Sequence, residues 1–242
     1  MNNIEKIDIL AIGAHPDDVE LGCGATLAKE IASGKKIGIL DLTRGELGTR
    51  GTEEIREQEA EKAAAILQAK FRLNLGLPDG FFVNNKESQL KIVEIIRKYR
   101  PDIILCNPMD DRHPDHGKAG KLVSDACFLT GLRKVETVVD GISQAPWRPL
   151  QVYHYIQWKH EEPDFVVDVS GYIKKKIEAV FAFASQFGLD NRDEPGTVLT
   201  SENFKDSILY RAKDLGRLTG VAYGEGFTVE RYPLVNSVFD LK

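Results

Sequence analysis

Short apolar runs alternate with stretches of helical periodicity along the first half of the chain. The runs at residues 7–13, 37–42, 71–75 and 102–107 predict strands. The first is nearly all apolar and β-prone, as expected of a strand buried on both faces. Helices are predicted at about 19–33, from Thr52 to about Ala69, and around the apolar positions Leu90, Val93, Ile96 and Tyr99. This βαβα alternation predicts an α/β fold, a Rossmann-like and mostly parallel sheet with helices on both faces.

The second half of the chain is less regular. We expect strands at 151–157 and 165–169, and helices at 117–132, 171–185 and 201–219. The polar run 190–196 predicts an exposed loop, and 222–227 predicts a glycine-flexed segment that reaches a site or a neighbouring subunit. No internal repeat or low-complexity linker is found, so we expect one domain over residues 1–242.

Composition narrows the class of protein. A chain of 242 residues with 42% hydrophobic content can bury a large core. The net charge of −5 is spread along the sequence, which argues against a nucleic-acid or membrane surface. No signal pattern or membrane-length apolar run is seen. Cys23, Cys106 and Cys127 form no Cys-x-x-Cys pair, so we expect a cytoplasmic protein and a plainly buried Cys106.

Two turns with the same three residues carry the chemistry. His15-Pro16-Asp17-Asp18 and His113-Pro114-Asp115-His116 each follow a predicted strand, so both should open on one edge of the sheet. Histidine and aspartate are also common turn and cap residues, but two such turns on one edge favour a metal site. Adjacent Asp17 and Asp18 cannot easily bind one ion together, so one should bind metal and the other stay free.

Two imidazoles and one carboxylate leave room for a water, which is the open arrangement of catalytic zinc. Non-haem iron oxygenases use the same ligand types, usually on the strands of a barrel. A strand-to-helix turn therefore favours hydrolysis.

Several other residues have weaker signals. The polar, glycine-rich stretch 43–51 is typical of a functional loop. Arginines at positions 44, 50, 56 and 112 fall on or near the expected site edge, which predicts an anionic group on the substrate. The run Lys174-Lys175-Lys176 predicts a solvated face, and Phe181, Phe183 and Phe187 predict core or a subunit interface. His154 is expected to be a packed histidine, and Gln186 has no role assigned from sequence.

The motifs carry a family resemblance. Ala14-His15-Pro16-Asp17-Asp18-Val19-Glu20 with the later His-Pro-Asp-His resembles the LmbE-like (PIG-L) superfamily of zinc-dependent N-acetylglucosaminide deacetylases. The likeness extends through residues 43–46, 56–60, 74–80 and 223–227. In that form it is most similar to the bacillithiol-biosynthesis branch, which deacetylates N-acetylglucosaminyl-malate.

The resemblance implies a role for each matching residue. His15, Asp18 and His116 match the zinc ligands, with one zinc or other divalent ion per chain. Asp17 matches the general base, and His113 the histidine that supports the transition state, with Asp115 oriented behind it. Arg56 and Asp79 match positions that hold the sugar. The mycothiol branch has a tyrosine before its His-Pro-Asp-His where this chain has Asp110-Asp111-Arg112, so Arg112 or His113 must contact the oxyanion. The resemblance also implies a homo-oligomer such as a hexamer.

Three alternatives to this function remain at the level of sequence. The first is a deacetylase of free N-acetylglucosamine or chitobiose, and the second is a thiol-conjugate amidase. The third is a sugar-binding or metal-storage protein without turnover. A free Asp17 beside the ligands argues against storage, because storage needs no base.

Overall fold

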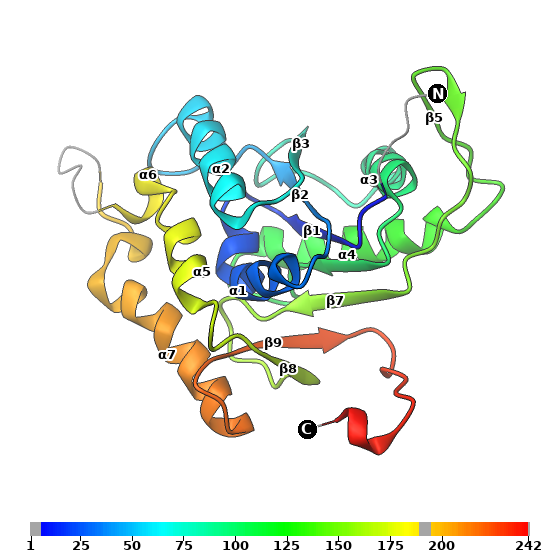
Figure 1. Cartoon of the computed structure of the whole chain (residues 1–242). Coiled ribbons are helices and arrows are strands. Elements are labelled where there is room, and N and C mark those ends of the chain that lie inside the picture. Colours follow the sequence, from blue (N-terminus) through cyan, green and yellow to red (C-terminus); the bar gives the residue numbers. More distant parts are fainter. Residues whose placement is uncertain (1–5, 189–194, 242) are drawn as a thin grey trace.

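A seven-stranded sheet forms the centre of the protein, in the computed structural model that describes residues 6–188 and 195–241. The strand order is β3-β2-β1-β4-β7-β9-β8 (Figure 1). The strands are β1 (Ile9–Gly13), β2 (Ile37–Thr43), β3 (Phe71–Leu77), β4 (Ile103–Cys106), β7 (Gln151–Tyr155), β8 (Phe165–Asp168) and β9 (Gly224–Val229). The first five in spatial order are parallel, and β9 runs antiparallel to both β7 and β8. A separate two-stranded ribbon pairs β5 (Val138–Val139) with β6 (Ile142–Ser143).

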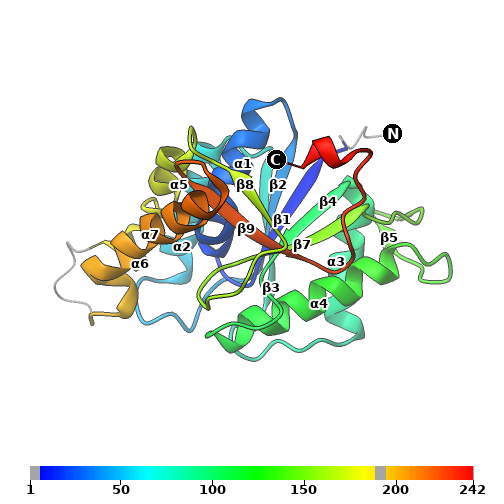
Figure 2. The same ribbon diagram turned by 90° about the horizontal axis from the view of Figure 1, so that it is seen from below.

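Helices cover both faces of the sheet. On one face lie α1 (Asp18–Ala32), α2 (Glu53–Leu67) and α5 (Ile173–Val180), and on the other α3 (Lys86–Tyr99) and α4 (Pro114–Thr130) (Figure 2). The short α6 (Ala184–Phe187), the turn η1 (Val198–Thr200) and the long α7 (Glu202–Thr219) extend the first layer, and η2 (Val238–Asp240) lies near the C-terminus. The predicted fold class is therefore confirmed.

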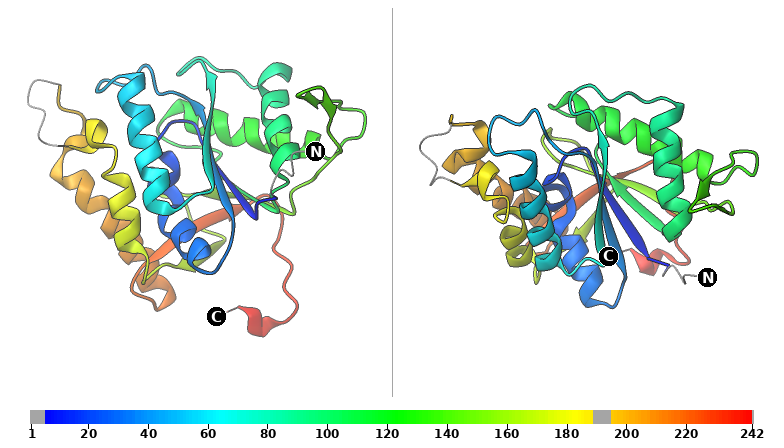
Figure 3. Two further views of the ribbon diagram at one scale, coloured as in Figure 1. Left: turned by 45° about the horizontal axis from the view of Figure 1, so that its top comes forward. Right: turned by 90° about the horizontal axis from the view of Figure 1, so that it is seen from above.

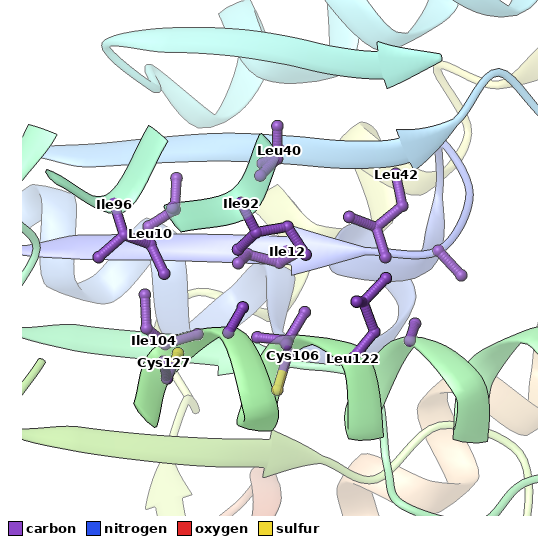
Figure 4. Packing of buried hydrophobic residues seen from close by; sticks show 14 of the residues in the cluster. Leu10, Ile12, Leu40, Leu42, Ile92, Ile96, Ile104, Cys106, Leu122 and Cys127 are labelled. Atoms are coloured by element: carbon purple, nitrogen blue, oxygen red, sulfur yellow. The ribbon is translucent and has the colours of Figure 1, made fainter. Parts of the chain in front are cut away.

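Alternate residues of the central strands face opposite layers. Leu10 and Ile12 of β1 pack with Leu40 of β2 against Ile92 and Ile96 of α3 (Figure 4). Their neighbours in β1, by contrast, pack against α1 and α2 on the other face. Side chains of successive strand residues point to opposite faces, so a strand covered on both sides is apolar throughout. This explains why β1, β2 and β4 are visible as mostly apolar runs, whereas the edge strand β3 is only partly buried and contains Arg72 and Asn74.

A third apolar cluster joins α2, α5, α6 and α7. Phe183 and Phe187 are fully buried in it, and the Phe187 ring stacks on Phe204 of α7 with the centroids 5.7 Å apart. Core or a subunit interface was predicted for these phenylalanines, and the structure places them in the core.

Two expectations for the second half are wrong. The helix expected at 171–185 stops at Val180 and resumes as α6. The segment 222–227 is no flexed loop, because residues 224–229 form β9 inside the sheet. A Cβ on Gly224 would lie 2.5 Å from a methyl group of Val166, so glycine serves strand packing here. Residues 190–194 of the expected exposed loop lie outside the described residues.

The prediction that the three lysines at 174–176 form a solvated face is wrong for Lys176. It is 4% exposed, and its Nζ lies 2.7 Å from Oε1 of Glu225. Glu225 also accepts hydrogen bonds from the backbone amides of Ala25 and Thr26, where α1 is kinked at Cys23. Lys176 can be buried because it pairs with the carboxylate of Glu225. A run of three lysines in the sequence does not indicate such a partner.

The strand order reverses its direction at β1, which makes this strand a topological switch point. This strand lies between β2 and β4, and the helix after β1 packs on one face while the helix after β4 packs on the other (Figure 3). Ligands of α/β proteins bind at such a switch point, at the carboxyl ends of the strands. Both His-Pro-Asp turns are located there. Among the described residues, no helix has the length and hydropathy to cross a bilayer.

Candidate active site

The two turns are held together by the residue that directly follows β4. Asn107 accepts a hydrogen bond from the backbone amide of Ala14 at 2.8 Å, and its own amide nitrogen donates to Asp18 at 3.0 Å. Because Ala14 follows β1 and Asn107 follows β4, this pair of bonds fixes the two strand ends against each other. The backbone of His15 also donates to the Asp18 carboxylate at 3.0 Å. The first turn is thus pre-formed around Asp18.

Asp18 lies between the two predicted ligand histidines. Its Oδ2 is 3.5 Å from Nδ1 of His15, and its Oδ1 is 3.1 Å from Nε2 of His116. Two donors that are each about 2.0–2.1 Å from one tetrahedral ion lie roughly 3.3 Å from each other. Asp18 therefore approaches both predicted ligand histidines at about this spacing, with a different carboxylate oxygen facing each.

Each of these histidines has a second carboxylate on its other ring nitrogen. Nε2 of His15 is 3.0 Å from Oδ1 of Asp79, and Nδ1 of His116 is 2.7 Å from Oδ2 of Asp111. Metal-binding histidines almost always donate their second N–H to a carboxylate or carbonyl, which fixes the tautomer and the ring orientation. Sequence reasoning assigned no role to Asp111, and its position five residues before His116 was the available signal.

The charges around this centre suit a cation. Burial alone would lower the pKa of His116, but Asp18 and Asp111 raise it to about 9. Burial alone would raise the pKa of Asp18, but His116 and His15 hold it well below its usual value. Buried carboxylates here draw protons onto the imidazoles, and a divalent ion would neutralise the same carboxylates while the histidines bind it unprotonated. The donor set therefore fits a divalent metal.

Among the described residues, two groups of ligand atoms lie within 4.8 Å of one another. One comprises His15, His113 and His116, and the other comprises His15, Asp79 and Asp115. Both share His15, but its Nε2 lies 3.0 Å from Asp79 and 3.5 Å from Asp115, whereas its Nδ1 faces Asp18. Asp18 itself belongs to neither group.

Asp17 points away from this ligand set, although it is adjacent to Asp18 in sequence. Its Oδ2 lies 3.2 Å from Nη2 of Arg56, and both residues are buried. Burial, opposed in part by Arg56, raises the pKa of Asp17 to about 7. A carboxyl group that titrates near neutrality can both accept and return a proton, as a general base requires. Only one of the two aspartates approaches the histidines, as the sequence predicted.

Arg56 is fixed by its own hydrogen bonds. It donates to the carbonyl oxygens of Pro16 and Gly45 as well as to Asp17. Gly45 has a φ of +67°, and a Cβ there would lie 2.0 Å from Nη1 of Arg56, so the loop needs glycine at this position. Arg56 lines the cavity described below, but its observed contacts make it a positioning residue for Asp17.

His113 differs from the expectation. Its Nδ1 accepts the backbone N–H of Asp115 at 3.2 Å, while the Asp115 carboxylate accepts from Gly80 N at 2.7 Å and from Lys118 at 2.9 Å. Asp115 is therefore not oriented behind His113. Burial and the nearby His15 and His116 lower the pKa of His113. With Nδ1 accepting, the neutral ring carries its proton on Nε2, which remains a donor.

The arginines near the site separate into two groups. Arg112 and Arg56 line the same cavity as the histidines. Arg44 is instead paired with Glu53 at 3.2 Å, and Arg50 donates to the backbone of Ser185 at 2.9 Å. Neither of these lines the cavity, so the expected cluster of four site arginines is wrong in two positions.

A cavity of about 720 Å³ opens over the metal-binding residues. This is within the usual range for small-molecule sites. Leu47, Gly48 and Thr49 of the predicted functional loop line it, and so does Gln186. Residues of α7 and β9 also line it, and they include both apolar and polar side chains.

His154 and the cysteines lie outside this centre. Nδ1 of His154 is 2.7 Å from the carbonyl oxygen of Asn107, and its Nε2 is 3.1 Å from Glu230. It is 2% exposed and packed as expected. Cys106 is buried and free, as are Cys23 and Cys127.

Several known proteins with similar sequences are named as deacetylases. The chain is 31% identical over 237 residues to the diacetylchitobiose deacetylase of Thermococcus kodakarensis, covering 93% of this chain and 83% of that protein. It is 25% identical over 198 residues to the probable N-acetyl-alpha-D-glucosaminyl L-malate deacetylase 2 of Bacillus anthracis, covering 74% and 81%. The crystal structure of the conserved protein TT1542 from Thermus thermophilus superimposes with a TM-score of 0.85 and 36% identity, covering 96% and 98%.

The fold and the site define an α/β enzyme with a candidate His/Asp metal centre at the switch point of its sheet. The family profile described as PIG-L, GlcNAc-PI de-N-acetylase, matches residues 10–127. The chain belongs to the PIG-L family and is a hydrolytic deacetylase.

Proposed function

We propose that this enzyme removes the acetyl group from an N-acetylated glucosaminide with the help of a zinc ion. His15, Asp18 and His116 would hold the ion. The observation that carries this proposal is the position of Asp18, which meets a ring nitrogen of each histidine while Asp79 and Asp111 take the other nitrogens. The named relatives that deacetylate amino sugars support the choice of substrate class.

When bound, zinc would supply Lewis acidity and lower the pKa of a water molecule to about 7. The protein's own side chains carry out the proton transfers. Asp17 accepts the proton of the attacking water and later returns it to the departing amine. Its pKa of about 7 suits both transfers. Arg56 holds the carboxylate in place through its bonds to Asp17 and to the backbone of Pro16.

His113 would act on the oxygen of the reacting carbonyl. Its Nδ1 is engaged by the backbone of Asp115, so Nε2–H is the free donor. The ring centroid is 4.7 Å from that of His15 and 5.1 Å from that of His116. A donor at this position stabilises the negative charge that develops on the carbonyl oxygen. A neutral His113 can do this, so the mechanism does not require an imidazolium.

Within this class we propose N-acetylglucosaminyl-malate, the substrate of bacillithiol biosynthesis, as the molecule acted upon. The motif resemblance and the Bacillus anthracis relative support it. Free N-acetylglucosamine or chitobiose is the second candidate, which the similarity to the Thermococcus kodakarensis enzyme favours.

The experiment is a direct one. The purified enzyme is loaded with zinc and incubated separately with each of these substrates, and acetate and free amine are measured. We expect turnover that stops on chelation and returns when zinc is added back. Full activity in metal-free protein, checked by elemental analysis, contradicts the zinc proposal, and the absence of acetate from every substrate contradicts the deacetylase proposal.

We further propose a cytoplasmic homo-oligomer. The buried, unpaired cysteines support a reducing compartment. Tyr232, Leu234 and Phe239 follow β9 on a segment that leaves the sheet (Figure 1), and each is more than 90% exposed. Exposed apolar side chains in such a row are typical of an interface. Light scattering should give a multimer for the full chain and a smaller species for a chain that ends at residue 231. A monomeric full chain contradicts this proposal.

A further inference from the structure

His154 contacts two oxygen atoms that belong to distant parts of the sequence. It lies near the end of β7, which is between β4 and β9 in the sheet (Figure 2). Its Nδ1 is 2.7 Å from the carbonyl oxygen of Asn107, which follows β4. Its Nε2 is 3.1 Å from Oε1 of Glu230, which follows β9. The side chain thus links the ends of three strands.

Both ring nitrogens of His154 face oxygen acceptors. A neutral imidazole carries one N–H and can donate to only one of them, whereas an imidazolium donates to both. Burial alone would lower the pKa of His154, but Cys106, Glu230 and the Asn107 carbonyl raise it to about 11. Burial alone would raise the pKa of Glu230, but the bond to His154 lowers it. His154 is therefore a charged donor near neutral pH, and Glu230 balances its charge.

The carbonyl of Asn107 needs a donor because it lies beyond the end of its strand. β4 ends at Cys106, which the register of the sheet pairs with His154. Asn107 is fully buried and leads to Pro108 and the second His-Pro-Asp turn. A buried carbonyl outside a strand ladder must be satisfied by a side chain or by water. His154 supplies the donor, and it fixes the backbone at this point.

The side chain of Asn107 is engaged entirely at the metal centre. Its Oδ1 accepts from Ala14 N, and its Nδ2 donates to Oδ2 of Asp18 at 3.0 Å and to Oε1 of Gln157 at 3.1 Å. Gln157 in turn donates to Oδ1 of the same Asp18. Each oxygen of Asp18 therefore accepts from an amide side chain. The orientation of both amides depends on where the backbone of Asn107 lies.

We infer that His154 is a positioning residue for the metal centre, which acts on Asp18 through Asn107. This inference rests on the proposed function and assigns support of a zinc ligand to a residue that does not line the cavity. The path has two hydrogen bonds, from His154 to the Asn107 carbonyl and from the Asn107 amide to Asp18. Replacing a residue that bonds directly to a ligand typically lowers metal affinity about 10–100-fold. His154 is one bond further away, so we expect the lower end, about tenfold.

Two substitutions separate the two contacts of His154. The amide nitrogen of asparagine can take the place of Nδ1, and that of glutamine the place of Nε2. His154→Asn therefore keeps a donor to Asn107, whereas His154→Gln keeps only the bond to Glu230. Zinc affinity is measured by competition with a chromophoric chelator. We expect His154→Gln to bind zinc about tenfold more weakly and His154→Asn to stay within about twofold of the unmodified enzyme.

Kinetics and melting distinguish positioning from a purely structural role. At saturating zinc, His154→Gln should lower kcat for acetate release with little change in KM, because the substrate contacts are unaltered. Both variants should melt at a lower temperature, because each loses one buried hydrogen bond. A purely structural role would lower both melting temperatures and leave both zinc affinities unchanged. If His154→Gln does not fold, the smaller His154→Ala, which also lacks the donor, replaces it.

Tyr155→Phe is the matched control. Tyr155 is on the same strand and fully buried, and its hydroxyl donates to the carbonyl oxygen of Ile12 at 3.0 Å. The substitution removes a bond of the same kind that does not lead to Asn107, so it should lower the melting temperature and leave zinc affinity unchanged. The route through Asn107 is tested with a double variant. His154→Gln combined with Asn107→Ala should bind zinc no more weakly than Asn107→Ala alone.

Three results overturn the inference. The first is a zinc affinity of His154→Gln equal to that of the unmodified enzyme. The second is an equal loss of affinity in both His154 variants, which would assign the support to Glu230. The third is additive losses in the double variant, which would mean that His154 does not act through Asn107. The expected zinc affinities without acetate release by the unmodified enzyme would instead contradict the proposed deacetylation and leave the positioning role intact.

Discussion

Asp111 offers the sharpest test of how the metal centre is built. Its Oδ2 is 2.7 Å from Nδ1 of His116, and its Oδ1 accepts the backbone N–H of Lys159 at 2.8 Å. Replacing it by asparagine keeps the size of the side chain and removes the charge. His116 then loses the carboxylate that makes Nε2 a stronger donor to the ion and that fixes the orientation of the ring.

The expected cost can be estimated from the geometry. Loss of an outer carboxylate from a metal-binding histidine typically lowers metal affinity 10–100-fold. The short contact and the burial of Asp111, which is 8% exposed, place the Asp111→Asn variant toward the upper part of that range. The asparagine oxygen can still accept one backbone N–H, so the segment at residues 158–159 should stay in place.

Asp110→Asn is the control. Asp110 is the preceding residue, its side chain is 80% exposed, and it pairs with Lys159 at the surface. Both variants remove one negative charge from the same loop, but only Asp111 contacts a proposed ligand. Zinc affinity is measured by competition with a chromophoric chelator, at one pH and ionic strength for all three proteins. We expect Asp110→Asn to match the unmodified enzyme. An Asp111→Asn variant with affinity within about twofold of the unmodified enzyme refutes the assignment of His116 as a ligand supported by Asp111.

Five further substitutions test the site and the fold. Asp17→Asn should keep its zinc and lose about 10²–10⁴-fold in kcat, the usual contribution of a general base, and a metal-free variant would make Asp17 a ligand instead. His113→Ala should keep its zinc and lose about 10²–10³-fold in kcat, whereas His116→Ala should lose zinc by elemental analysis; the reverse pattern would exchange their roles. Lys176→Met leaves the Glu225 carboxylate buried without its cation, which costs about 3–5 kcal/mol, or roughly 6–20 °C in Tm. Lys174→Met, at an exposed position on the same helix, should not shift the Tm of a thermal melt, and equal melting of both variants would show that the buried pair is unimportant.

The predictable part of the fold is the part in which local pattern and burial agree. Strands β1, β2 and β4 lie inside the sheet with helices on both faces, so each is mostly apolar and stands out from the flanking polar turns. The strand β9 contains Gly224, Glu225 and Gly226, residues that are individually unfavourable in strands. Tertiary contacts explain why these residues occur in the strand. Gly224 lies against Val166, and Glu225 binds the amides at the kink of α1 together with Lys176.

The same distinction applies to the site. The two His-Pro-Asp turns are local in sequence, and a shared sheet edge is enough to predict that they meet. Asp111 and His154 act through partners that the fold brings close from far along the chain. His154 reaches Asn107 across 47 residues. A side chain of this kind carries no spacing or motif, so only the structure shows what it contacts.

The divergence of Asp17 and Asp18 has a backbone cause. Asp17 has a φ of 114°, in the left-handed region that non-glycine residues seldom occupy. Such a conformation costs about 1–3 kcal/mol and persists only where neighbouring contacts enforce it. Here the enforcing contacts are the bond from Arg56 to the Pro16 carbonyl and the bond from the His15 amide to the Asp18 carboxylate. The chain direction changes between the two aspartates, so one carboxylate faces the histidines and the other faces Arg56. An alanine at position 17 would keep the unfavourable φ and lose the proton acceptor. The strained residue is thus the one whose side chain the reaction needs, which supports a catalytic role for Asp17 over a role in folding.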